Sequence, residues 1–173
     1  MIIYEGPSQA GGDDIVVIVA GFKSKSSNRK TGKMIQTWIL LKDTHPSEAL
    51  KTGADQSICG DCIHRPRFDE ASGKTRRTCY VNIMGPNQIW KTYRAGKYER
   101  VDPEVAGDLL SGLPIRLGSY GDPAMVPIDV WRSLIKNASK TTGYTHQWRT
   151  MSSEYSEFCM ASCDTADDVE DAK

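Results

Sequence analysis

The stretch "SICGDCIHRP", residues 57–66, holds the side chains of this chain that are best suited to metal chemistry. Cys59 and Cys62 are three positions apart, and the glycine after Cys59 lets the backbone turn sharply enough for both sulfurs to face one ion. Sixteen residues lie between Cys62 and Cys79, a loop length typical of zinc ribbons, and His64 can add a nitrogen ligand. The spacing predicts a tetrahedral zinc site made of Cys59, Cys62, His64 and Cys79.

We expect this zinc to be structural, because four protein ligands leave the ion no open position. The segment 53–78 is rich in Gly, Pro and charge, and a loop of that length needs a source of order other than a core. Two alternatives remain. Cys159 or Cys163 can complete an iron–sulfur site with the three other cysteines, or the thiols bind no metal and Cys159 is a small strand hydrophobe. A neighbouring histidine favours zinc, since clusters are held mostly by sulfur.

A second set of polar residues follows three expected strands, in the stretches "SYGDP", "THQWR" and "SCD". Ligand sites in parallel α/β proteins form at the carboxyl ends of strands, so we expect these stretches to meet in space. The candidate catalytic residues are Asp122 and His146, and the candidate ligand-binding residues are Ser119, Tyr120 and Arg149.

In this hypothesis Asp122 and His146 act as an acid–base pair or as metal ligands, and Arg149 holds an anion. Each also has a structural interpretation. Asp122 before a proline is a common turn residue or helix cap, and a strand histidine is more often a satisfied core or surface residue.

The net charge is zero, but the charges are unevenly distributed. Residues 23–33 carry five bases and no acid, "HRPRFDEASGKTRR" forms a second basic cluster, and the tail from Asp164 carries five acids against one lysine. Such asymmetry is typical of a polyanion-binding face, although a solvated loop has the same composition. The candidate phosphate contacts of the first cluster are Arg29, Lys30 and Lys33.

Composition predicts one domain over residues 1–173 in the cytoplasm, without a membrane span. The longest apolar run, Ile15 to Phe22, is less than half of the roughly 20 residues that a span requires, and the first residues do not resemble a leader. An odd number of cysteines, five, argues against a complete disulfide framework.

The elements that must position these residues are predicted from apolar periodicity and turn residues. A β-hairpin is expected over 14–43, a short helix over 46–52, and an irregular metal-bound segment over 53–85 that ends in a strand at "TCYVNIMG". Residues 102–173 alternate helix and strand, beginning with a helix capped by Asp102. We expect strands at "LPIRLGSY", "GYTHQW" and "EFCMASC", a helix at "IDVWRSLIKNAS" and a last helix that starts at Thr165. The predicted fold is α/β, with strand–helix units of a partly parallel sheet that resembles an incomplete barrel.

Several nucleotide and hydrolase motifs are absent: GxGxxG, GxxxxGK[ST], GxSxG, HExxH and CxxxCxxC. Their absence excludes most dinucleotide-binding, P-loop, serine-hydrolase, zinc-protease and radical S-adenosylmethionine proteins.

The stretches "NRKTGKMIQTWIL", "ICGDCIHRP", "RTCYVN", "IRLGSYGDPAMVP" and "TGYTHQW" together resemble an uncharacterised protein family encoded by bacteriophages and related bacterial elements. The likeness covers about residues 15–163. "GDP…YTHQW" is also weakly similar to "SGDF…YTRSW" of another phage family with a suspected barrel-like fold. Members of the first family continue through another strand to a further cysteine-rich segment. The resemblance therefore implies a shortened, cytoplasmic phage-type protein with a Cys/His site.

These observations support three functional hypotheses. The first is a zinc-stabilised accessory protein that binds nucleic acid or another phosphate-bearing ligand. The second is a metal-containing enzyme that acts on a small anionic or nucleotide substrate at the strand ends. The third is a phage factor that binds a host protein.

Overall fold

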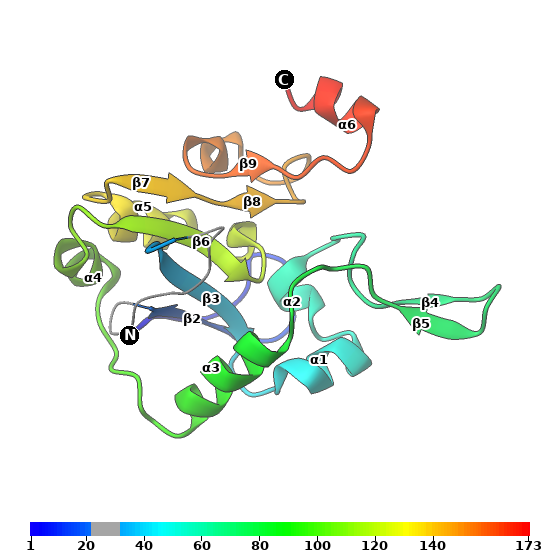
Figure 1. Ribbon diagram of the computed structural model, residues 1–173, viewed down its shortest axis with the longest axis horizontal. Coiled ribbons are helices and arrows are strands. Elements are labelled where there is room, and N and C mark those ends of the chain that lie inside the picture. Colours follow the sequence, from blue (N-terminus) through cyan, green and yellow to red (C-terminus); the bar gives the residue numbers. More distant parts are fainter. Residues whose placement is uncertain (22–31) are drawn as a thin grey trace.

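The computed structural model describes residues 1–21 and 32–173 and is built around one five-stranded sheet (Figure 1). Its strands, in spatial order, are β1 (Ile2–Gly6), β2 (Ile15–Ala20), β3 (Ile35–Leu41), β6 (Pro114–Tyr120) and β7 (Lys140–Thr142). β1, β2 and β3 pair antiparallel, whereas β6 and β7 run parallel to β3. The predicted α/β fold with a partly parallel sheet is confirmed, and within the described residues the sheet does not close into a barrel.

The N-terminal hairpin formed by β2 and β3 is the best predicted element. Residues 15–19 of β2 are completely buried, as expected of a continuous apolar run in the middle of a sheet. The two edge strands were not predicted: β1 contains only two buried residues, and β7 is the polar sequence "KTT". Both owe their strand conformation to pairing with a neighbour rather than to a sequence pattern.

Six α-helices are described, α1 (Pro46–Thr52), α2 (Gln56–Cys59), α3 (Met84–Arg94), α4 (Pro103–Leu109), α5 (Ile128–Ile135) and α6 (Ala166–Asp171). The helices α4 and α6 begin at the predicted caps, Asp102 and Thr165, and α1 ends at Gly53 in the left-handed conformation. The helices α1, α2 and α3 contact β3, and α4 packs against α5 (Figure 1). None of the helices in the described ranges combines the length and apolar character needed to cross a bilayer.

Two predictions for the middle of the chain are wrong. The segment 53–78 has secondary structure of its own, namely α2 and an exposed hairpin of β4 (Arg67–Asp69) and β5 (Lys74–Arg76). "TCYVNIMG" is not a strand, because residues 77–82 are irregular and α3 begins at Met84. Its apolar residues are divided between core and solvent: Val81 and Ile83 pack against the core, whereas Tyr80 and Met84 are exposed.

The C-terminal strand units are shorter than predicted. "GYTHQW" contributes only β8 (Tyr144–Thr145), and "EFCMASC" contributes the end of a 3-10 helix (Ser153–Glu157) and then β9 (Met160–Ala161). β8 and β9 pair parallel to each other as a separate two-stranded sheet. His146 and Asp164 therefore follow neighbouring parallel strands.

A bend in β6 sets the position of the residues that follow it. Gly118 has φ of 62°, where an added Cβ would lie 2.6 Å from the carbonyl oxygen of Gly121. The register between β3 and β6 shifts here, and the fully buried Thr37 bridges the gap: its hydroxyl donates to the carbonyl of Arg116 and accepts from the N–H of Gly118. The chain then turns through Tyr120 and Asp122 into a 3-10 helix (Pro123–Met125).

Candidate metal centre and pocket

A pocket of about 630 Å³ lies where α2, the end of β6, β8 and the segment after β9 meet. The sequence predicted that the strand ends bearing Asp122, His146 and Asp164 would meet, and all three residues line this pocket. The four predicted zinc ligands, Cys59, Cys62, His64 and Cys79, also line it. One cavity is thus lined by all four predicted zinc ligands and by both candidate catalytic residues, Asp122 and His146.

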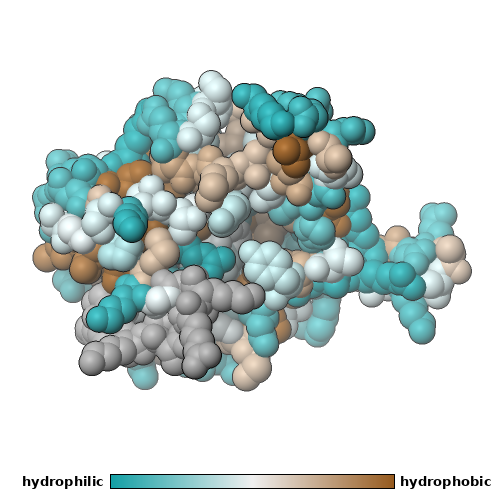
Figure 2. Space-filling view, turned by 45° about the horizontal axis from the view of Figure 1, so that its top comes forward, coloured by the Kyte–Doolittle hydropathy of each residue, from teal (hydrophilic) through white to brown (hydrophobic). Residues whose placement is uncertain are grey.

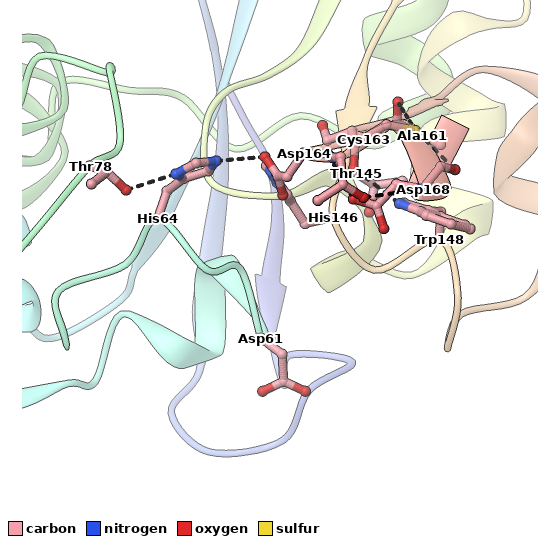
Figure 3. Close-up of polar contacts among 12 residues, drawn as sticks. Asp61, His64, Thr78, Thr145, His146, Trp148, Ala161, Cys163, Asp164 and Asp168 are labelled. Carbon is pink, nitrogen blue, oxygen red and sulfur yellow. Dashed lines mark hydrogen bonds and ion pairs between the residues drawn. The ribbon is translucent and has the colours of Figure 1, made fainter. Parts of the chain in front are cut away.

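His64, His146 and Asp164 form the tightest group of metal-ligand atoms (Figure 3). One ligand atom from each lies within 4.8 Å of the other two, and this is the only such group of three among the described residues. His64 Nε2 lies 2.8 Å from Asp164 Oδ1, and His146 Nε2 lies 3.5 Å from Asp164 Oδ2. Two atoms bound about 2 Å from a tetrahedral ion are about 3.3 Å apart, so ligand atoms separated by up to 4.8 Å must move closer together when all three bind one zinc ion.

A hydrogen bond at the other ring nitrogen of His64, Nδ1, fixes the orientation of the ring. His64 Nδ1 lies 2.7 Å from Thr78 Oγ1, and the His64 and His146 rings meet edge to face at 5.3 Å (Figure 3). In metal sites the second nitrogen of a ligating histidine usually donates to a hydrogen-bond acceptor of the protein. Thr78 supplies that acceptor if His64 binds the ion through Nε2.

Gln147 joins the cysteine knuckle to the loop that carries His146. Its side-chain amide donates to the carbonyl of Cys59 and accepts from the N–H of Asp61. Gly60 makes this contact possible, because its φ is 55° and an added Cβ would lie 2.5 Å from Gln147 Cδ. The predicted sharp turn of the knuckle is present, and it also leaves room for the side chain of Gln147, in the loop after β8.

Asp122 positions the loop that carries His146, and its predicted role in acid–base chemistry stays a prediction. Its buried carboxylate accepts from the N–H of Ala124, as an N-cap, and from the N–H of His146 at 2.9 Å. Burial raises the pKa of the Asp122 carboxyl. The Asp122 N–H donates to the carbonyl of Ile58 at 2.7 Å, so this residue connects β6, α2 and the His146 loop.

The cysteines line the pocket without forming the predicted tetrahedron. Within the described residues no three ligand atoms of the set Cys59, Cys62, His64 and Cys79 come together, and His64 faces Asp164 instead. Burial raises the pKa of the Cys59 thiol well above its usual range, and it also raises the pKa of Cys62. A bound metal lowers such pKa values, so zinc binding by these thiols stays a prediction.

The two remaining cysteines differ from each other. Cys159 is buried in the core, where burial and then the charge of Asp122 raise the pKa of its thiol to about 12. Cys163 lines the pocket, and its Sγ lies 3.5 Å from the carbonyl oxygen of Asp168. Of the two sulfurs suggested for an iron–sulfur alternative, only that of Cys163 faces the same space as the knuckle.

The proposed anion-binding residues are dispersed. Arg149 does not line the pocket: its guanidinium stacks on Trp148 and pairs with Asp168 and Asp171 at 2.8 Å each. Ser119 also lies outside the lining, with its hydroxyl donating to Gln36 Oε1. Lys33 is exposed at the start of β3, at the opposite end of the strands from the turn after β6, whereas Arg29 and Lys30 lie outside the described residues.

Tyr120 and two arginines supply polar groups that the sequence hypothesis only partly identified. The Tyr120 hydroxyl lines the pocket, is buried and has no hydrogen-bond partner in the described part of the chain. Arg65 is neutralised by a two-point contact with Asp55. Arg77 and Arg116 line the pocket, and neither pairs with a carboxylate of the described residues. Nothing in the sequence around Arg116 marks it, because it lies inside a strand.

No family model, curated protein or solved structure matches this chain. Its function is therefore inferred from the geometry of its own side chains.

The C-terminal helix holds Asp164 in place and is expected to loosen in acid. Hydrogen bonds from Arg149 and then from the Asp164 N–H lower the pKa of Asp168 to about 2. A lowered pKa means that the ionised form favours the docked helix, so the stabilisation is complete above the ordinary value of 3.8 and is lost as the pH falls towards about 2. We expect amide exchange in α6 to increase over this interval while β2 stays protected. Asp168→Asn should abolish the pH dependence, and an unchanged profile in that variant would contradict the assignment.

Proposed function

We propose that this protein binds a zinc ion through His64, His146 and Asp164 and uses the ion to bind a phosphate-bearing ligand in the adjoining pocket. The observation that carries the proposal is the convergence of these three side chains from segments that are far apart in sequence. Histidine nitrogen and aspartate oxygen both bind zinc at about 2.0–2.2 Å. Chance salt bridges are common, but two imidazoles on the two oxygens of one carboxylate are an arrangement suited to a cation.

An ion with three protein ligands keeps at least one open coordination position. A phosphate oxygen can occupy that position, which makes ligand binding dependent on the metal. This differs from the closed, structural site that the sequence predicted. The cysteines beside it then form the wall of the pocket rather than the ligand set.

The charge of the pocket wall supports an anionic ligand. Arg65 is already paired with Asp55, whereas Arg77 donates only to the backbone carbonyls of Cys79 and Val81. The Arg77 charge is also close enough to Tyr120 to influence its pKa, which burial raises strongly. Arg77, Arg116 and Tyr120, whose buried hydroxyl has no partner among the described residues, therefore line a space next to the proposed ion. Positive charge of this kind suits the recognition of phosphate.

The proposal is tested with purified protein by elemental analysis and by calorimetric titration with inorganic tripolyphosphate. We expect one zinc per chain and binding of tripolyphosphate that disappears when a chelator removes the metal and returns when zinc is restored. Tripolyphosphate binding that is the same with and without metal would refute the metal's role. Iron in place of zinc would assign the same two-histidine, one-carboxylate group to Fe(II) chemistry and would refute the zinc assignment.

A metal-containing enzyme is the second candidate, and the open position favours it, since zinc lowers the pKa of a bound water to about 7. Both oxygens of the Asp122 carboxylate accept hydrogen bonds from backbone N–H groups, those of Ala124 and His146, so a role of Asp122 as the base stays a prediction. Phage origin, a cytoplasmic location and binding of a host protein stay predictions from the sequence.

A further inference from the structure

Two exposed tyrosines lie on the lining of the same pocket. Tyr80 is 84% exposed and Tyr144 is 50% exposed, although large aromatic side chains are usually at least partly buried. Tyr80 belongs to the irregular segment after β5, and Tyr144 belongs to β8. From their position we propose that the ligand is a nucleotide, with its phosphates at the metal and arginines and its base stacked on these tyrosines. This inference rests on the proposed function and specifies its ligand.

The two tyrosines come from segments on either side of the metal ligands. In Figure 3, Thr78 lies on one side of the His64–Asp164 pair and Thr145 lies on the other. Tyr80 is two residues from Thr78, and Tyr144 is adjacent to Thr145. A ligand whose phosphate reaches the ion can therefore extend an aromatic group towards either segment.

The pocket has the size of a nucleotide site. Its volume of about 630 Å³ lies within the roughly 300–1,000 Å³ usual for small-molecule and cofactor sites. Stacking of a base on an aromatic side chain is tolerant of sequence and strengthens binding about 5- to 150-fold per base. Phosphate alone would not require exposed aromatic groups at the rim, whereas a base does.

The nucleotide can be free, or it can be an unpaired nucleotide of a nucleic-acid strand. The β4–β5 hairpin distinguishes these two sources. This hairpin projects from the body with a largely hydrophilic surface (Figure 2). Arg67 and Arg76 lie opposite each other across the pair. Arg76 also contacts Asp69 at 3.5 Å, whereas Arg67 and Lys74 have no carboxylate partner among the described residues. A nucleic-acid strand that ends in the pocket would gain phosphate contacts from these basic side chains, and a free nucleotide would not.

The test compares ATP with tripolyphosphate on the zinc-loaded protein, because the two share a phosphate chain and differ by the nucleoside. We expect ATP to bind more tightly. Tyr80→Ala and Tyr144→Ala should each reduce ATP affinity, by about 5- to 150-fold for the tyrosine that carries the base, and leave tripolyphosphate unchanged. Phe68→Ala, which removes an exposed aromatic group outside the pocket, is the matched control and should change neither.

Equal affinities for ATP and tripolyphosphate, or ATP affinity that is unaffected by both tyrosine variants, would overturn the nucleotide inference and leave the proposed function intact. Failure to bind tripolyphosphate would instead refute the proposed function. A short thymidine oligonucleotide distinguishes the sources. If the oligonucleotide binds more tightly than ATP, and the difference disappears when Arg67, Lys74 and Arg76 are replaced with serine, the ligand is a nucleic-acid strand. If the oligonucleotide and ATP bind equally, the ligand is a free nucleotide. Both outcomes support a nucleotide as the ligand class.

Discussion

Replacing His146 with alanine is expected to reduce the affinity of the protein for zinc by more than 100-fold. Loss of an outer-shell partner of a metal ligand already costs about 10- to 100-fold, and this substitution removes one of three direct ligands. The fold should persist, because the contacts that hold this loop use the backbone of His146 and the side chain of Gln147. Competition with a chromophoric chelator measures the affinity, and thermal unfolding reports on the fold.

The matched control is His45→Asn, which removes the remaining histidine while keeping a residue able to cap α1. Zinc affinity should be unchanged in this control. Thr78→Val should fall between the two, with a loss of about 10- to 100-fold, because it removes the acceptor that orients His64. If His146→Ala retains full affinity while Cys62→Ser loses it, the ion is bound by the cysteines and the proposed centre is wrong.

Replacing Arg116 with methionine is expected to weaken tripolyphosphate binding by about 10- to 150-fold. Hydrogen bonds to charged groups contribute about 1.5–3 kcal/mol, and methionine keeps much of the packing of the arginine stem while it removes the charge. The backbone of Arg116 still accepts the hydrogen bond from Thr37, so the strand should keep its bend. Calorimetry on the zinc-loaded protein measures the effect.

Arg132→Met is the control for that experiment, since Arg132 is paired with Glu154 and Glu157 and does not line the pocket. It should bind tripolyphosphate like the unaltered protein. Equal weakening in both variants would show that net charge, rather than a contact in the pocket, governs the affinity.

Much of the fold could be predicted because its signals are local. The apolar run of β2, the Asp102 and Thr165 caps and the glycine that ends α1 each determine an element from neighbouring residues. The strands β1 and β7 were not predicted, and β8 and β9 are shorter than predicted, because runs of two to five residues carry too little periodicity and depend on partners elsewhere in the chain.

The candidate site was predicted in its parts but not in its assembly. Spacing within "CGDCIH" indicated a ligand set from nearby residues, whereas the structure groups His64 with two residues more than 80 positions later. Sequence alone gives no sign that Thr78 orients His64 or that Gln147 fits against Gly60. The first contact forms across the base of the β4–β5 hairpin, and the second forms only when the loop after β8 packs against the knuckle. Tyr120 was selected from its place at a strand end, and the structure adds that its hydroxyl is buried and unpartnered.

X-ray absorption at the zinc edge of the metal-loaded protein tests the central claim most directly. Binding by His64, His146 and Asp164 predicts a first shell of nitrogen and oxygen at about 2.0–2.2 Å, with imidazole scattering and no sulfur. A first shell dominated by sulfur at about 2.3 Å would place the ion among Cys59, Cys62 and Cys79 and would contradict the account.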